Sequence, residues 1–119
     1  MIYLASAYSY DRQQGYEEAL AISAQILKLG IPIFSPIAHS HPMSETYDFP
    51  TDWAFWRDVD FQYIDACKEV WVYMDAEGKW HTSVGVQAET VYAISKGYAV
   101  VYISGVIDAA KAWKEKNSA

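Results

Sequence analysis

The sequence predicts an α/β fold in which a mostly parallel sheet of four or five strands lies between two layers of helices. Short apolar runs rich in β-branched and aromatic residues alternate with longer amphipathic stretches along the chain, and this alternation is typical of parallel sheets. No internal repeat or linker interrupts it, and 119 residues suffice for one domain with a real core. The predicted architecture is therefore a single Rossmann- or flavodoxin-like three-layer sandwich over residues 1–119.

The boundaries of the elements follow from the apolar runs and from the residues that separate them. Strand character is found at residues 2–6, 31–34, 69–74 and 98–103. Helices are expected at residues 11–29, 51–67, 82–97 and 104–116, with Gly30 and Gly97 as stops and Thr51 or Asp52 as a cap. The segments 35–50 and 75–82 are expected to be loops, and the second is long enough to act as a flap over a site.

Composition restricts the class of partner. A hydrophobic content of 52% and a charged content of 20% indicate a globular chain. The net charge of -6, with only nine basic residues, argues against polymeric nucleic acid as a partner. The apolar runs are too short for a membrane span, and residues 1–5 read as a strand rather than a leader, so we expect a cytoplasmic location. Cys67 is the single cysteine, which excludes a disulfide framework.

The helix expected at residues 82–97 is the strongest candidate for carrying chemistry. Thr82 or Ser83 can cap its start, where free N–H groups and the positive end of the helix dipole suit a phosphate or another polar group. At about 3.6 residues per turn, Glu89 shares a face with Gly85 and Ala93, whose small side chains leave room for a ligand. The alternative interpretation, that Glu89 is a solvated helix residue, is about equally favoured by this segment alone.

A second carboxylate is expected on an apolar face of the helix at residues 51–67. Helical spacing places Asp60 in one stripe with Trp56 and Ile64, whereas Asp58 and Asp65 project to the opposite side. Burying an unpaired charge is costly, so such a residue is paired, hydrogen-bonded or functional. We favour a functional role for Asp60 over a structural one.

Further polar groups are expected at the carboxyl edge of the sheet, where α/β proteins bind their ligands. They are Tyr3, Ser6, Tyr8, Ser35, Asp75, Ser83 and Glu89. His39 and His41 lie in the segment read as a loop, where two residues of spacing would place both on one side of an extended chain. No third metal ligand stands near them, so we expect no metal and favour a hydrogen-bonding role for His39 at the mouth of a site or plain loop structure.

Several enzyme classes are disfavoured by missing motifs. The sequence contains no Gly-x-Gly-x-x-Gly after the first strand, no Walker motif and no Gly-x-Ser-x-Gly elbow. What remains is a small domain with Asp and Glu carboxylates directed at one crevice. Paired carboxylates suit glycosidic-bond chemistry, in which one attacks the anomeric carbon and the other handles the proton of the leaving group.

The element Ser83-x-Gly85-Val86-x-x-Glu89, preceded by a helix that bears Asp60, resembles the nucleoside 2-deoxyribosyltransferase superfamily, which includes the 2'-deoxynucleoside 5'-phosphate N-hydrolases. The opening Ile-Tyr-Leu-Ala-Ser and the Ser-Pro after the second strand fit the same pattern. The chain more closely resembles a small bacterial and phage branch with the signatures Ser-Pro-x-x-His-Ser-His-Pro and Ser-Val-Gly-Val-Gln-Ala-Glu. The resemblance spans nearly the whole chain.

The resemblance implies roles for individual residues. Glu89 would be the nucleophile that forms a covalent 2-deoxyribosyl intermediate, and Asp60 would handle the leaving base or its proton. Ser83 would help to bind a 5'-phosphate, and Ala5 and Ser6 would shape the pocket. Tyr3 or Tyr8 would orient the nucleophile or stack on the base; Ser35, His39, Asp75 and Gly85 complete the expected substrate-binding set. No cofactor is expected.

Two functions are therefore carried forward. The first is an enzyme that cleaves or transfers the N-glycosidic bond of a 2'-deoxynucleoside or its 5'-monophosphate, with the pKa of Asp60 raised by its apolar surroundings and Glu89 ionised. The second is a non-catalytic module that binds or senses a nucleotide, because Val91 stands where the family often has glycine. The high aromatic content of 16% also leads us to expect a homo-oligomer.

Overall fold

Four parallel strands form a single sheet in the computed structural model, which describes residues 1–50 and 52–118. The strand order is β2–β1–β3–β4, and every neighbouring pair is parallel. The strands are β1 (Ile2–Ala5), β2 (Ile33–Phe34), β3 (Glu69–Tyr73) and β4 (Ala99–Ile103). This order has a switch point at β1, because the chain continues from β1 to β2 on one side and reaches β3 on the other. The predicted fold class is confirmed.

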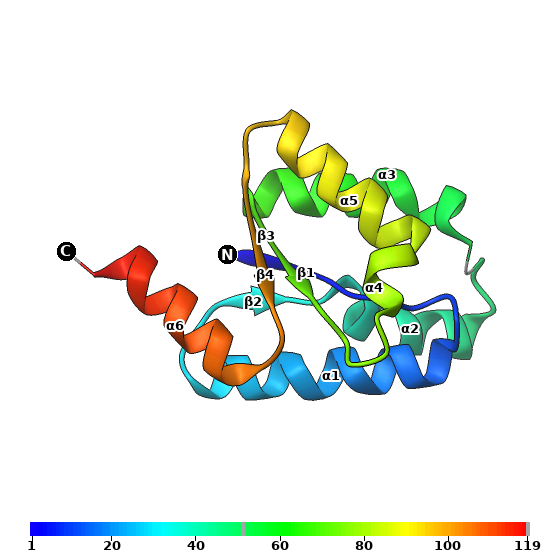
Figure 1. The fold of residues 1–119 in the computed structure, drawn as a ribbon. Coiled ribbons are helices and arrows are strands. Elements are labelled where there is room, and N and C mark those ends of the chain that lie inside the picture. The colour runs from blue at the N-terminus through cyan, green and yellow to red at the C-terminus, as the bar shows by residue number, and fades with distance from the viewer. Residues whose placement is uncertain (51, 119) are drawn as a thin grey trace.

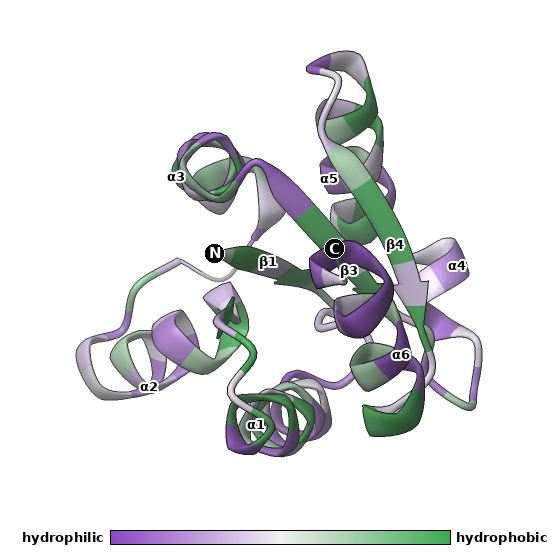
Figure 2. Cartoon of the chain, turned by 90° about the vertical axis from the view of Figure 1, so that its left-hand side faces the viewer, coloured by the Kyte–Doolittle hydropathy of each residue, from purple (hydrophilic) through white to green (hydrophobic). Residues whose placement is uncertain are grey.

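Helices cover both faces of the sheet, as a three-layer sandwich requires (Figures 1 and 2). One face carries α1 (Arg12–Lys28) and α6 (Val106–Asn117), and the other carries α3 (Trp53–Cys67) and α5 (Val84–Ser95). Two further helices, α2 (Pro36–Tyr47) and α4 (Lys79–Thr82), lie toward the carboxyl ends of the strands (Figure 1). They narrow the open edge of the sheet.

Alternation along β1 divides its side chains between two cores. Ile2 and Leu4 point to the cluster under α1 and α6, which also contains Ile26. Tyr3 and Ala5 point to the opposite cluster, under α3 and α5. A fully buried tyrosine therefore lies directly beneath the two helices that carry Asp60 and Glu89.

The prediction of a loop over residues 35–50 is wrong for most of that segment, because residues 36–47 form α2. Ser35 is its N-cap, with Oγ accepting from Ala38 N at 3.1 Å, and Pro36 occupies the first turn, where its missing N–H has no cost. Pro42 stands inside the helix, which a sequence pattern takes as a break. Packing of α2 against α1 outweighs that signal.

Two other boundaries differ in detail from the prediction. Asp52 caps α3 by accepting from Phe55 N at 3.2 Å, whereas Thr51, the other expected cap, lies outside the described residues. The expected flap at residues 75–82 contains the single-turn helix α4. Leu20 and Leu27 of α1 are about half exposed, at 47% and 52%. The buried face of this helix is formed by Gly15, Ala19, Ile22, Ser23 and Ile26.

Several large apolar side chains are exposed, including Val84, Val91 and Ile94 on α5. A single chain does not test the expected homo-oligomer, which stays a prediction. Among the described residues, no helix combines the length and the apolar character needed to cross a membrane.

Candidate functional site

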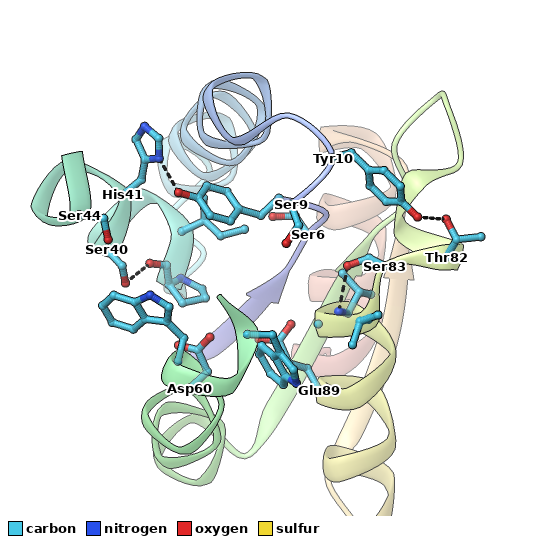
Figure 3. Close-up of a pocket in the computed structure, with 18 residues that line it drawn as sticks. Ser6, Ser9, Tyr10, Ser40, His41, Ser44, Asp60, Thr82, Ser83 and Glu89 are labelled. Atoms are coloured by element: carbon cyan, nitrogen blue, oxygen red, sulfur yellow. Dashed lines mark hydrogen bonds between the residues drawn. The ribbon is translucent and has the colours of Figure 1, made fainter. Parts of the chain in front are cut away.

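A cavity of about 390 Å³ opens at the carboxyl end of β1, beside the switch point of the sheet (Figure 3). Its size lies within the range of pockets that hold small molecules. Four parts of the chain line it: the loop after β1, the inner side of α2, the first turns of α3 and the start of α5. The lining residues are Ser6, Tyr8, Ser9, Tyr10, Pro36, Ile37, Ser40, His41, Ser44, Trp53, Trp56, Asp60, Thr82, Ser83, Val84, Gly85, Val86 and Glu89.

Two buried carboxyl groups lie at the base of the cavity, Asp60 from α3 and Glu89 from α5 (Figure 3). The hydroxyl of Tyr3 donates a hydrogen bond to Oε2 of Glu89. Oδ1 of Asp60 is buried and has no hydrogen-bond partner among the described residues. An unpaired polar atom of this kind is costly in a fold unless a ligand or water meets it. The three residues expected to be catalytic are thus brought together.

The electrostatics of this cluster differ in part from the expectation. Burial raises the pKa of Asp60 to about 7, and the Tyr3 hydroxyl opposes that shift. Burial also raises the pKa of Glu89 well above its usual value, the charge of Asp60 adds to the shift, and the Tyr3 hydrogen bond opposes it. The raised pKa of Asp60 has the expected direction, whereas the raised pKa of Glu89 opposes the ionised state expected for it. Two adjacent buried carboxyls titrate as a pair and retain protons together.

Tyr3 remains a hydrogen-bond donor over the whole physiological range. Burial raises its pKa well above 10, and the nearby charges of Glu89 and Asp60 raise it further. A protonated tyrosine between two carboxyls favours the charged form of whichever carboxyl it meets. It therefore favours an ionised Glu89 against the effect of burial.

The start of α5 faces the cavity. Oγ of Ser83 accepts from Val86 N at 3.3 Å, as an N-cap does. The ring of Trp53 packs over Gly85, where a Cβ would lie 3.5 Å from it, an ordinary van der Waals contact. Glu89 is only 5% exposed, so the interpretation of Glu89 as a solvated helix residue is wrong. The predicted inner face of α5 is confirmed.

The expected substrate-binding residues divide into two groups. Ser6, Tyr8, Ser83 and Gly85 line the cavity. Ala5 does not reach it and is fully buried in the core under α3 and α5. The small residues after β1 therefore shape the pocket chiefly through Ser6.

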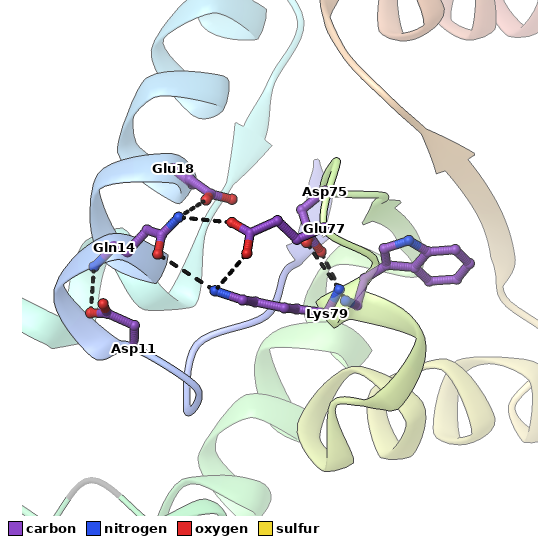
Figure 4. Close-up of polar contacts among 7 residues, drawn as sticks. Asp11, Gln14, Glu18, Asp75, Glu77 and Lys79 are labelled. Atoms are coloured by element: carbon purple, nitrogen blue, oxygen red, sulfur yellow. Dashed lines mark hydrogen bonds and ion pairs between the residues drawn. The ribbon is translucent and has the colours of Figure 1, made fainter.

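Three residues that were expected to bind the substrate do not line the cavity. Each of them belongs to, or forms hydrogen bonds with the start of, a helix that the sequence did not predict. Ser35 caps α2. Asp75 accepts from the backbone N–H groups of Lys79 at 3.0 Å and Trp80 at 2.8 Å, the first two residues of α4, whose N-cap is Gly78 (Figure 4). His39 is exposed and makes an edge contact with Phe34, outside the cavity.

His41, rather than His39, lines the cavity. Its Nδ1 lies 2.7 Å from the hydroxyl of Tyr8, and its ring stacks on Tyr16 at 4.4 Å between centroids. Ser40 and Ser44 lie on the same side of α2 (Figure 3). No sequence signal short of recognising α2 as a helix would have identified this set. Within the described residues, no three His, Cys, Asp or Glu side chains gather as a metal site would require.

Trp53 and Trp56 were also missed as lining residues. Both precede Asp60 on α3, by seven and four positions, which is helical spacing on one face. The sequence therefore held a usable signal for them: two tryptophans on the same side as the buried carboxyl. They give the cavity an aromatic wall of the kind on which a planar ring can stack.

Comparison with known proteins places these observations in a family. The family described as "Domain of unknown function (DUF1937)" matches residues 1–105, a range that includes all four strands and every residue lining the cavity. No curated protein sequence matches the chain. The match covers most of the 119 residues, so the chain belongs to the DUF1937 family.

Proposed function

We propose that the protein cleaves or transfers the N-glycosidic bond of a 2'-deoxynucleoside or of its 5'-monophosphate. One observation carries the proposal: two buried carboxyls from different helices share the base of a small cavity, and a buried tyrosine is hydrogen-bonded to one of them. The resemblance of Ser83-x-Gly85-Val86-x-x-Glu89 to deoxyribosyltransferases is consistent with this chemistry. The aromatic wall formed by Trp53 and Trp56 suits a base.

The proposed reaction has two steps. A carboxylate oxygen of Glu89 attacks the anomeric carbon, a C–O ester bond forms and the bond to the base nitrogen breaks. The electron pair of that bond leaves with the base, and Asp60 donates a proton to the departing base. Water or a second base then attacks the same carbon and breaks the ester, while Asp60 accepts the proton of the incoming group. Hydrolysis of a nucleoside yields free 2-deoxyribose and hydrolysis of its monophosphate yields 2-deoxyribose 5-phosphate, whereas transfer yields a new nucleoside or nucleotide.

The reactive form carries one proton on the pair, on Asp60. Because burial raises the pKa of both carboxyls, the free pair holds protons near neutral pH. The Tyr3 hydrogen bond to Glu89 favours the arrangement in which Glu89 is charged and Asp60 is protonated. Activity is therefore expected to fall above about pH 7, where Asp60 loses its proton, and to fall again at low pH, where Glu89 gains one.

A second candidate is a non-catalytic module that binds a nucleoside or nucleotide. The observation that favours it is the raised pKa of Glu89, because a neutral glutamic acid donates a hydrogen bond and does not attack carbon. In that case the two carboxyls would recognise the ligand by hydrogen bonds alone. The two candidates differ in whether bonds are broken.

The test is incubation of the purified protein with a panel of deoxynucleosides and deoxynucleoside 5'-monophosphates, with and without a second free base. Released and exchanged bases are separated by liquid chromatography. Matched variants are Asp60→Asn against Asp58→Asn, which changes an exposed carboxylate on the same helix, and Glu89→Gln against Glu115→Gln. Mass spectrometry of a quenched reaction would detect a 2-deoxyribosyl group on Glu89.

Base release or exchange that is lost in Glu89→Gln and Asp60→Asn and kept in both controls supports the enzyme. Binding of a ligand without any turnover, retained in Glu89→Gln, supports the binding module. Activity that survives Glu89→Gln would contradict the proposed nucleophile.

A further inference from the structure

The cavity has two carboxyls at its base, those of Asp60 and Glu89, and none of its 18 lining residues is lysine or arginine. The proposed reaction needs one of these carboxyls, Glu89, in its charged form. A ligand that brings a phosphate dianion would meet that charge inside a low-dielectric cavity, where repulsion is strong. A neutral ligand would not.

The basic groups nearest to the cavity are directed to other partners. Lys79 lies 3.6 Å from the carboxylate of Glu77 and 3.5 Å from Oε1 of Gln14, in a network on the α1 side of the loop (Figure 4). His41 directs Nδ1 to Tyr8. Arg12, at the start of α1, does not line the cavity, and its charge opposes the rise that burial causes in the pKa of Tyr8. Neither Lys79 nor Arg12 is among the residues that line the cavity, and the Nδ1 of His41 is taken by the Tyr8 hydroxyl.

The polar groups in the lining of the cavity include the hydroxyls of Ser6 and Ser83, whereas a phosphate would need lysine or arginine side chains there. Oγ of Ser6 is buried and has no hydrogen-bond partner in the part of the chain that the structure describes. Oγ of Ser83 accepts from the backbone, so its own proton is free to be donated outward. A serine hydroxyl both donates and accepts, and therefore matches a sugar hydroxyl, which does the same.

The start of α5 attracts an anion, with about half a unit of positive charge. The same helix carries Glu89 one turn beyond Gly85, about 6 Å along the axis. A phosphate bound at this helix start would lie close to the ionised glutamate that the reaction needs. The partial charge of the dipole is smaller than the charges that it would have to offset.

We propose that the cavity selects an unphosphorylated 2'-deoxynucleoside, and that the hydroxyls of Ser6 and Ser83 bind hydroxyl groups of its sugar. This inference rests on the proposed function and narrows its substrate class. It assigns Ser83 to a neutral oxygen, in contrast to the 5'-phosphate role implied by the resemblance to nucleotide hydrolases.

The test compares kcat/KM for a deoxynucleoside and for its own 5'-monophosphate, with the same base in both. We expect the nucleoside value to be at least about tenfold higher. Ser6→Ala should lower the nucleoside value by about tenfold, the loss expected for one buried hydrogen bond. Equal or higher kcat/KM for the monophosphate would overturn the inference and leave the proposed function intact.

A variant that adds a positive charge sharpens this comparison. Ser9 is exposed and lines the cavity, so Ser9→Arg adds a cation at its mouth without filling the base (Figure 3). It should raise the ratio of kcat/KM for the monophosphate to kcat/KM for the nucleoside severalfold, in a manner that added salt removes. Ser95→Arg, an exposed position at the far end of α5, is the matched control. No gain for the monophosphate in Ser9→Arg would count against charge as the selecting feature.

Failure of the proposed function is distinguished by calorimetry. If neither compound is turned over, the proposed catalysis is wrong, and binding of the same two compounds then judges the inference. Tighter binding of the nucleoside, weakened in Ser6→Ala, would support it. Tighter binding of the monophosphate, or no binding of either, would overturn it.

Discussion

Two glutamates of this chain are equally buried and are treated in opposite ways. Glu69 lies at the amino end of β3, where Oε2 accepts from Trp71 Nε1 at 2.7 Å and Oε1 pairs with Lys116 of α6. Glu89 lies at the carboxyl end of the sheet, where its neighbours are Tyr3 and a second carboxyl, Asp60. Their exposed fractions are 6% and 5%. Burial alone therefore does not distinguish a structural carboxylate from a candidate catalytic one.

The partners make the distinction. A cation and an indole N–H satisfy Glu69, and the pair joins α6 to the sheet. At the other end, burial and a like charge raise the pKa of Glu89, and Oδ1 of Asp60 has no partner among the described residues. Burying unpaired or like-charged groups lowers the stability of the fold, and such arrangements are typical of sites that bind a ligand.

The largest expected effect separates these two glutamates. Glu89→Gln should reduce base release on the order of a thousandfold or more, because the nucleophile is removed, with stability kept or increased. Glu69→Gln should leave kcat/KM within about twofold and lower the free energy of unfolding by about 1–3 kcal/mol, because Lys116 loses its buried counter-charge. Turnover assays and urea denaturation of both variants check this. The reverse pattern would show that the comparison assigns the two residues wrongly.

The second prediction concerns the hydroxyl that joins the pair. Tyr3→Phe removes the donor that favours the charged form of both carboxyls, so the pKa of Glu89 and the pKa of Asp60 should both rise. Glu89 then ionises only at higher pH, and Asp60 keeps its proton to higher pH. The whole profile of kcat/KM against pH should move to the alkaline side, and its maximum should fall by about tenfold.

Tyr73→Phe is the control for this variant, because Tyr73 packs against the core under α1 and α6 and does not line the cavity. It should leave the pH profile in place. A Tyr3→Phe profile that loses height without moving would indicate a purely structural role for the hydroxyl.

The third prediction concerns the loop that carries Ser6 and Tyr8. A Cβ at Gly15 would lie 2.8 Å from the carbonyl oxygen of Ala7 and 2.9 Å from Cα of Tyr8, so α1 or the loop must shift in Gly15→Ala. We expect a loss of about 1–3 kcal/mol in stability and a severalfold rise in KM. Gly105→Ala is the matched control, because nothing lies within 4 Å of a Cβ there and its backbone is extended. Equal KM values in the two variants would indicate that the loop does not contribute to ligand binding.

Much of the site could be predicted because it follows from the two regular periods of secondary structure. Alternation along β1 places Tyr3 beneath α3 and α5, and helical spacing places Asp60 and Glu89 on the inner faces of those helices. These three positions need only the fold class and the strand and helix boundaries. For that reason the sequence predicts them together.

The errors have one common physical cause, which is that tertiary packing decided the local structure. Residues two apart share a side in an extended chain and lie about 200° apart on a helix, so the formation of α2 separates His39 from His41 and turns only His41 to the cavity. The stack of His41 on Tyr16 of α1 is a contact between distant segments, and the sequence gives no sign of it. The direction of the pKa of Glu89 likewise depends on burial by residues from several elements.

The smallest expected effect is the change in the free energy of unfolding with pH. The sign of this change differs between the buried carboxyls and a partly exposed one. The folded-state pKa of Asp60 is about 7 and that of Glu89 is raised, so the folded protein binds more protons than the unfolded chain between about pH 4 and pH 7. The free energy of unfolding should therefore fall as pH rises through this window, by at most about 1.4 kcal/mol per pH unit for each whole proton. Asp65 has the opposite sign, because hydrogen bonds from Tyr92 and Tyr98 lower its pKa, and its contribution is lost as pH falls below about 4. Denaturation of Asp60→Asn across pH 4 to 8 should give a flatter curve than the unmodified protein, with the exposed Asp58→Asn as control; an unchanged slope in Asp60→Asn would mean that Asp60 is charged in the folded state at neutral pH and is not the proton donor.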